Sequence, residues 1–291
     1  MRNVGTHSIS DAVKATFKCE DERTALLLTR LVDYLHDYAR EVNLTHAEWR
    51  KAIEMLTKAG EISDEERNEF VLFSDLLGVS SLVDMINSPP GGTESSVLGP
   101  FHILGAPDLP IGGDMKKDNE GPTSVVSGIV RDGNGKSIEG AVLEIWQTSD
   151  NGLYSNQDPG QDRFNLRARQ VTGADGRYAF TTVKPAPYTV PNDGPAGELL
   201  AVTNRHPWRP SHLHFIVMAD GCQTLVTELF PEDDPYLDED AVFGVRESLI
   251  LTYKRRDDLA DLPPGLEAAA SIEAPFYTVD FDFTLVPAVA G

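Results

Sequence analysis

The stretch TSVVSGIVRDGNGKSIEGAVLEIWQT, residues 123–148, decides the fold. Two runs rich in valine and isoleucine flank a segment with Asp-Gly and Asn-Gly, the residue pairs that favour tight turns between strands. Four further strand-like runs follow, separated by turn signals: 174–183, 211–219, 224–230 and 277–286. Short strands with turns between them predict an antiparallel β-sandwich over residues 123–291.

Upstream of the sandwich, the residues have the pattern of amphipathic helices. Between positions 21 and 43, apolar residues recur at intervals of three and four: Leu27, Leu28, Leu31, Leu35 and Tyr38. Residues 91–122 are instead rich in proline and glycine and too interrupted for regular elements. We therefore expect a helical region over residues 1–90, an ordered linker over 91–122 and the β-sandwich after it.

Two capping-box patterns and one glycine predict where these helices begin and end. Thr45 is followed three residues later by Glu48, and Ser63 by Glu66, so each serine or threonine is expected to begin a helix. Gly78 is expected to end the helix that starts near Ser63, with a short fourth helix after it.

The composition excludes several classes of partner. The chain has 291 residues and a net charge of −21, which argues against binding to nucleic acid or to anionic membranes. No run approaches the roughly 20 apolar residues of a membrane helix, and the first residues lack the apolar middle of a signal peptide. Cys19 and Cys222 lie too far apart for a metal motif or a disulfide framework. We expect a reduced, cytoplasmic protein.

The stretch HPWRPSHLHFIV, residues 206–217, places two histidines, His212 and His214, in an otherwise apolar strand. Side chains two residues apart on a strand share one face, roughly 7 Å apart along the chain, so two imidazoles can converge on one metal ion. The spacing alone leaves open ordinary buried histidines with hydrogen-bond partners, and His206 is expected to lie outside any ligand set.

Two tyrosines occupy turns of the predicted sandwich. Tyr154 follows a strand in SDNGLYSNQDPG, and Tyr188 lies among prolines in KPAPYTVPNDGP. Position alone is also compatible with a structural role, in which each ring caps the core of the sandwich and forms a hydrogen bond through its hydroxyl.

Three segments in chain order change this interpretation. Residues 152–154 (GLY), 187–191 (PYTVP) and 209–215 (RPSHLHF) resemble the signature of the intradiol ring-cleaving dioxygenases, the catechol 1,2-dioxygenase group. A helical segment ahead of a β-sandwich is also the arrangement of that group. The resemblance covers almost the whole chain, and four ligand positions at near-family spacing are far more specific than His-x-His.

The resemblance implies one non-haem Fe(III) per subunit, held by Tyr154, Tyr188, His212 and His214. Phenolate oxygen is a hard, anionic ligand that favours Fe(III) over Fe(II). The implied reaction is cleavage of an aromatic ring by O2 between two carbons that carry vicinal hydroxyls. In it, Tyr188 takes a substrate proton and moves aside, and the metal acts as a Lewis acid and a template.

Two further residues gain roles by the same resemblance. Arg209 matches an arginine near the substrate ring, where its guanidinium would stabilise developing negative charge. Glu228 replaces the glutamine that catechol-cleaving members commonly carry, and it is expected to orient Arg209 or His212.

The segments 72–84, 95–102 and 241–249 resemble the hydroxyquinol 1,2-dioxygenase branch. The implied substrate is hydroxyquinol, benzene-1,2,4-triol, and the implied product is 3-hydroxy-cis,cis-muconate or its tautomer maleylacetate. Besides Arg209, the pocket residues implied by the resemblance are Leu72, Asp75, Val97, Leu98, Gly99, Pro100, Phe101, Val190, Pro191 and Val242.

Asp75 is the sharpest of these candidates. A carboxylate in the pocket can accept a hydrogen bond from the third hydroxyl of hydroxyquinol, and catechol would leave it unpaired at a cost of about 1–3 kcal/mol. Its position near a helix end is equally compatible with a local capping role.

Two alternatives remain at this point. One is a catechol or chlorocatechol 1,2-dioxygenase, and the other is a prealbumin-like β-sandwich module that binds ligands without catalysis. The family also forms homodimers through its N-terminal helices, so we expect region 1–90 to dimerise; the sequence does not decide whether a lipid binds there.

Overall fold

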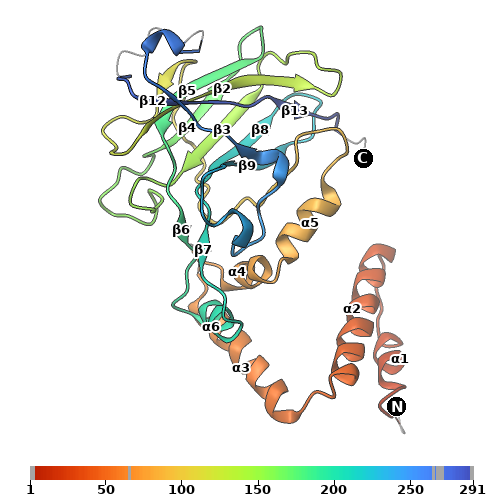
Figure 1. Cartoon of the computed structure of the whole chain (residues 1–291). Helices are drawn as coiled ribbons and strands as arrows, with labels where there is room; N and C mark the ends of the chain where they lie inside the picture. The colour runs from red at the N-terminus through yellow and green to blue at the C-terminus, as the bar shows by residue number, and fades with distance from the viewer. Residues whose placement is uncertain (1–3, 65–66, 264–265, 267–271, 289–291) are drawn as a thin grey trace. The chain divides into compact units, whose positions relative to one another are not determined.

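The computed structural model describes residues 4–64, 67–263, 266 and 272–288 (Figure 1). The chain divides into two compact units, Met1–Lys58 and Ala59–Gly291. The boundary falls inside the region 1–90 that was expected to be one helical part, so the last helices of that region belong to the second unit.

The first unit contains α1 (Ile9–Lys14), α2 (Glu22–Glu41) and the start of α3 (His46–Ile62). The capping box before α3 is confirmed. The Thr45 backbone N–H donates to Glu48 at 2.9 Å, and the Glu48 N–H donates to the Thr45 hydroxyl at 3.3 Å. No side chain of α2 is buried, and its predicted apolar stripe is exposed.

The prediction that Ser63 begins the next helix is wrong. Helix α4 runs over Glu69–Leu76 and its N-cap is Asn68, whose side chain accepts from the N–H groups of Phe70 and Val71, both at 3.1 Å. Ser63 instead accepts from the Glu69 N–H at 3.0 Å, and Glu66 lies outside the described residues. Because the Asn68 side chain accepts from the first backbone N–H groups of the helix, which have no partner within it, Asn68 determines where α4 begins.

Gly78 ends α4 as predicted, with φ +71° in the left-handed region. Helix α5 (Val79–Asn87) follows at once. A further helix, α6 (Pro195–Val202), was not predicted. The 3-10 turns span Leu237–Glu239, Glu247–Leu249 and Leu259–Asp261.

The second unit is built on two packed sheets. The first has the order β1-β5-β2-β12-β11 with β13 also paired to β2, and the second has the order β10-β9-β8-β3-β4. A separate ladder joins β6 to β7. The strands are β1 Gly113–Asp114, β2 Thr123–Asp132, β3 Val142–Gln147, β4 Arg167–Val171, β5 Arg177–Val183, β6 Tyr188–Thr189, β7 Trp208–Arg209, β8 Leu213–Met218, β9 Leu225–Pro231, β10 Ile250–Leu251, β11 Lys254–Arg256, β12 Phe276–Asp280 and β13 Phe283–Leu285.

The sandwich prediction is confirmed, but the sheets are mixed rather than purely antiparallel. Strands β12 and β13 run parallel to β2, and β1 and β10 run parallel to β5 and β9. Parallel neighbours need a long crossover rather than a hairpin. The long segment after β9 supplies one, and the hairpin signals of the sequence could not reveal it.

Alternation along β8 decides where the two histidines point. Leu213, Phe215 and Val217 belong to the core between the two sheets. Because successive side chains alternate, His214 lies on the other face of the sheet, which loops cover rather than the second sheet. On that face Trp146 of β3 and Glu228 of β9 are its direct cross-strand neighbours.

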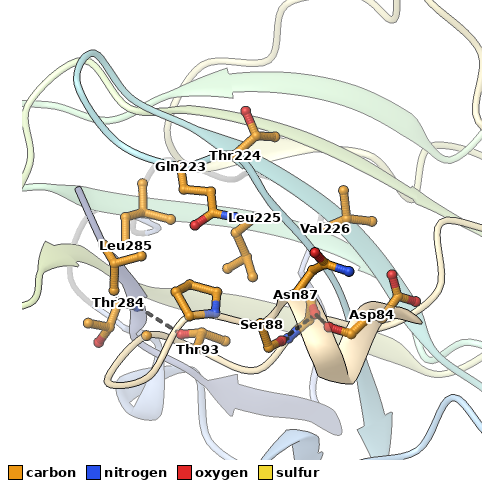
Figure 2. A pocket seen from close by; sticks show the side chains of 14 residues that line it. Asp84, Asn87, Ser88, Thr93, Gln223, Thr224, Leu225, Val226, Thr284 and Leu285 are labelled. Atoms are coloured by element: carbon orange, nitrogen blue, oxygen red, sulfur yellow. Dashed lines mark hydrogen bonds between the residues drawn. The ribbon is translucent and has the colours of Figure 1, made fainter. Parts of the chain in front are cut away.

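A small cavity of ≈ 170 Å³ lies between the end of α5 and strands β9 and β13 (Figure 2). Its volume is below the usual ligand-pocket range of roughly 300–1,000 Å³, and Asp84 is the one charged residue that lines it in the described part of the chain. None of the helices within the described ranges is both long and apolar enough to cross a membrane.

Candidate metal and substrate site

Three side-chain atoms converge beneath the loops that cover β8. The Tyr154 hydroxyl lies 3.2 Å from His212 Nε2 and 3.1 Å from His214 Nε2, and the two nitrogens are 3.0 Å apart. Each of these residues is at most 1% exposed. Ligand atoms that share a metal at roughly 2 Å lie about this far from one another. The triangle therefore has the size of one face of a metal coordination sphere.

Two close backbone contacts place the tyrosines. Gly152 has φ +76°, and a Cβ there would lie 3.1 Å from the Pro187 carbonyl, so the turns that carry Tyr154 and Tyr188 pack closely together. The Tyr154 and Tyr188 rings meet edge to face with centroids 5.3 Å apart. Tyr188 on β6 is the direct ladder partner of Arg209 on β7, so this short ladder brings the second tyrosine and the arginine to the same site.

Both histidines are held with Nε2 towards the tyrosine. His212 Nδ1 donates to the Pro210 carbonyl at 2.7 Å, which fixes the proton on Nδ1 and leaves a lone pair on Nε2. The His214 ring stacks on Trp146 with centroids 4.6 Å apart and planes 5° from parallel. His214 Nδ1 is buried without a hydrogen bond and lies 3.5 Å from a Glu228 oxygen.

Burial sets the protonation states of this group. It lowers the pKa of His212 and, together with the charge of His212, lowers the pKa of His214 well below its ordinary value. Burial also raises the pKa of Tyr154 well above its usual range, and it raises the pKa of Tyr188 against the opposing charge of Arg209. Neutral imidazoles are ready to bind a metal, and phenolates at this site need the field of a nearby cation. These residues fit a trivalent metal ion.

Arg209 is buried and held by two carboxylates. Its guanidinium donates to Glu228 at 2.7 and 3.0 Å and to Asp240 at 3.0 and 3.2 Å. Gly244 closes over this clamp, because a Cβ there would lie 2.6 Å from Arg209 Nη2. Arg209 Nη1 also lies 3.5 Å from the Tyr188 hydroxyl and 3.4 Å from His212 Nε2. A fixed positive charge therefore lies beside the Tyr188 hydroxyl and His212 Nε2.

Glu228 offers a competing donor set. Ligand atoms of His212, His214 and Glu228 all lie within 4.8 Å of one another. Both oxygens of Glu228, however, already accept from Arg209, and one of them also accepts from Ser96 at 2.6 Å. Burial acts to raise the pKa of Glu228, but the charge of Arg209 and the hydrogen bonds from Arg209 and Ser96 keep the pKa below its usual value. Glu228 is thus a counter-ion of Arg209; the expectation that it orients Arg209 or His212 stays a prediction.

A cavity of ≈ 980 Å³ lies above these atoms, and Tyr188 and Arg209 line it. Of the predicted pocket residues, those that line it are Leu72, Asp75, Val97, Gly99, Pro100, Phe101, Val190, Pro191, Arg209 and Val242. Leu98 does not line it: its side chain is 43% exposed, whereas Val97 is buried. Neighbouring side chains of this segment point in different directions: Val97 lines the cavity, whereas Leu98 is turned to solvent.

Asp75 lies in the cavity wall and is 8% exposed. Burial raises its pKa, opposed by a hydrogen bond from Ser80 and by the charge of Arg209. It therefore has both a local partner and a place in the pocket.

Three contributors to the site escaped the sequence prediction: Asp240, Ser96 and Arg167. Asp240 lies in an acidic surface-like run, DEDAV, and Ser96 in a serine-rich linker, so neither has a distinguishing pattern. Arg167 comes from β4, a strand that was not predicted.

Comparisons with known proteins cover nearly the whole chain. Residues 104–287 match the family model described as Dioxygenase, and residues 21–92 match Catechol dioxygenase N terminus. The chain is 45% identical to a hydroxyquinol 1,2-dioxygenase of Rhizobium sp. (strain MTP-10005), over 92% of this chain and 90% of the relative. It is 43% identical to a 6-chlorohydroxyquinol 1,2-dioxygenase of Cupriavidus pinatubonensis, over 99% of both.

Two solved structures are similar over nearly the whole chain. A hydroxyquinol 1,2-dioxygenase from Pseudomonas putida DLL-E4 has a TM-score of 0.88 at 43% identity and covers 97% of this chain and 99% of its own. A catechol 1,2-dioxygenase from Acinetobacter radioresistens has a TM-score of 0.84 at 30% identity, with 99% and 95% covered.

Proposed function

The chain belongs to the intradiol dioxygenase family, and we propose that it uses O2 to cleave hydroxyquinol between its two vicinal hydroxyl-bearing carbons. The product would be 3-hydroxy-cis,cis-muconate or its tautomer maleylacetate. The observation that carries this proposal is the buried triangle of Tyr154, His212 and His214 beneath a cavity that also contains a carboxylate, Asp75. The relatives that act on hydroxyquinol support the choice of substrate.

We propose that Tyr154, Tyr188, His212 and His214 hold one Fe(III) per subunit. The phenolate oxygens supply the hard anionic donors that this ion prefers. When bound, the ferric ion would act as a Lewis acid and a template on the vicinal diol. A site made of His212, His214 and Glu228 would favour Fe(II) instead, and the engagement of Glu228 by Arg209 and Ser96 argues against it.

The protein groups around the cavity have distinct tasks in this reaction. Tyr188 lines the cavity, so its oxygen can take a proton from an incoming hydroxyl. Arg209 keeps its positive charge beside the same position and stabilises negative charge on the substrate oxygens. Phe101 stacks on the Tyr154 ring with centroids 4.6 Å apart and forms an apolar wall against the aromatic substrate.

Asp75 is proposed to select the triol by accepting a hydrogen bond from its third hydroxyl. In Asp75→Ala we expect kcat/KM for hydroxyquinol to fall roughly 10- to 100-fold, because a hydrogen bond to a charged group contributes about 1.5–3 kcal/mol. Catechol turnover should stay within about threefold. Side-by-side kinetics of both substrates on iron-loaded protein measure the ratio.

Ser80→Ala is the matched control, since it removes the local partner of Asp75 and leaves the carboxylate in the cavity. An equal loss for both substrates in Asp75→Ala would assign the residue a purely structural role. If the unmodified enzyme prefers catechol, the proposal that hydroxyquinol is the substrate is wrong.

The exposed stripe of α2 is proposed to form a homodimer interface. Leu27, Leu31, Leu35 and Tyr38 are each more than half exposed, and a continuous apolar stripe of this kind is typical of an interaction site. Sedimentation velocity should give the mass of two chains, and Leu31→Glu with Leu35→Glu should shift the protein to one. A monomeric unmodified protein would contradict the interface.

The two free cysteines support a reducing, cytoplasmic location.

A further inference from the structure

Arg167 on β4 is a buried cation that the proposed reaction does not use. It is 3% exposed, and none of the carboxylates within the described ranges forms an ion pair with it. An arginine guanidinium keeps its positive charge at neutral pH. A buried charge without a counter-ion is costly. Its position therefore needs a functional or structural reason.

The guanidinium joins two segments that are far apart in the sequence. It donates from Nε to the Ser155 hydroxyl at 2.7 Å, from Nη1 to the Phe101 carbonyl at 2.6 Å and from Nη2 to the Asn156 side chain at 3.0 Å. Ser155 and Asn156 directly follow Tyr154, and the Phe101 ring stacks on Tyr154. One side chain thus fixes both the turn that carries Tyr154 and the ring that packs on it.

The charges of the site also place Arg167 in a specific role. Glu228 and Asp240 share the single guanidinium of Arg209, which leaves an excess of one negative charge on that side. The Arg167 guanidinium lies 5.9 Å from the centre of the Tyr154 ring. No carboxylate of the described residues pairs with this guanidinium. Because little water screens a buried charge, the guanidinium is expected to act strongly on a tyrosinate formed at this ring.

We infer that Arg167 is a positioning residue for Tyr154, which it holds in place through the Ser155–Asn156 turn and the Phe101 carbonyl while its charge stabilises the tyrosinate. This inference rests on the proposed function only for the charge. The tie between the two segments uses hydrogen bonds between groups of this chain alone, so it is testable without added metal.

The charge is tested by visible absorption of iron-loaded variants. A tyrosinate bound to Fe(III) gives a ligand-to-metal charge-transfer band, and a nearby cation lowers the energy of the phenolate electrons. We expect Arg167→Gln to move the absorption maximum to longer wavelength. Arg167→Lys keeps the charge and should stay near the wild-type maximum, as should Ser155→Ala, which removes one hydrogen-bond acceptor. An unshifted maximum in Arg167→Gln, or equal shifts in the Gln and Lys variants, would overturn the electrostatic role.

The positioning is tested by hydrogen exchange in the metal-free protein. The Tyr154 and Gln157 amides are protected by the turn itself, through bonds of 3.1 and 2.8 Å. Both the Gln and Lys variants lose bonds to the three acceptors, so these amides should exchange about tenfold faster or more. If glutamine prevents folding, Arg167→Lys still gives the result. Unchanged exchange in the variants would overturn the positioning role.

The two failures are distinguishable. A wild-type protein that binds no iron and has no visible band contradicts the proposed function. The hydrogen-exchange result on the same metal-free protein still decides whether Arg167 holds the Tyr154 turn.

Discussion

Replacing Tyr154 with phenylalanine should lower the rate of ring cleavage by more than about 100-fold. Loss of a residue that only supports a metal ligand costs up to about 100-fold, and loss of a ligand itself should cost more. The ring would still pack between Phe101 and Tyr188, but the oxygen 3.1–3.2 Å from the two histidine nitrogens would be gone. Iron content, the visible band and hydroxyquinol turnover measure the effect. We expect loss of most of the band and a lower iron stoichiometry.

Tyr178→Phe provides the matched control. Tyr178 is equally buried, and its hydroxyl donates to the Phe281 carbonyl at 2.7 Å within the sandwich. Its loss should cost about 1 kcal/mol of unfolding free energy and leave iron and activity intact. A Tyr154→Phe enzyme with full iron and an unchanged band would show that the tyrosine is no ligand and would favour the set with Glu228.

Replacing Arg209 with methionine should have the second-largest effect. The variant leaves Glu228 and Asp240 buried and without their shared cation. Breaking a buried pair in this way costs about 3–5 kcal/mol of unfolding free energy, and losing the charge beside the substrate should lower kcat about 10²–10³-fold. Denaturant unfolding and steady-state kinetics measure the two losses separately.

The stability loss should depend on pH with a definite sign. In the wild type the pKa of Glu228 is lowered, so its stabilising contribution is present at neutral pH and is lost as the pH falls through the folded-state pKa. Without Arg209, burial raises that pKa and the folded variant takes up a proton. The free energy of unfolding of the variant should therefore fall furthest below that of the wild type at about pH 8, and the difference should be smaller at about pH 5.

Arg255→Met is the control for this experiment, since Arg255 is 59% exposed and pairs with Asp257 on the surface. Its effect should stay below about 1 kcal/mol at both pH values. An Arg209→Met variant no less stable than Arg255→Met would contradict the clamp.

The sequence predicted those parts of the fold that depend on local chemistry. The valine- and isoleucine-rich runs became β2 and β3, and the Thr45–Glu48 box begins α3. It could not predict the parallel pairing of β12 with β2, because strand partners far apart in the chain leave no local pattern. Strand β4 was missed for a different reason, because its residues RARQV are mostly charged and polar and do not have the pattern of a strand.

For the site, the family-like segments brought forward the tyrosines and histidines that the structure places together. Asp240 and Arg167 remained hidden, because the burial of a charged side chain depends on what folds over it and not on its neighbours in sequence. The Leu98 prediction was wrong because membership of a pocket-lining segment does not fix the direction of each side chain.

The most direct test of the central claim is the fate of oxygen during hydroxyquinol turnover. Iron-loaded protein is supplied with hydroxyquinol under ¹⁸O2, and the product is analysed by mass spectrometry. Cleavage between the vicinal hydroxyls should give a ring-opened dicarboxylic acid with one labelled oxygen in each new carboxyl group. A semialdehyde from cleavage beside the diol, or a product with a single labelled oxygen, would contradict the account.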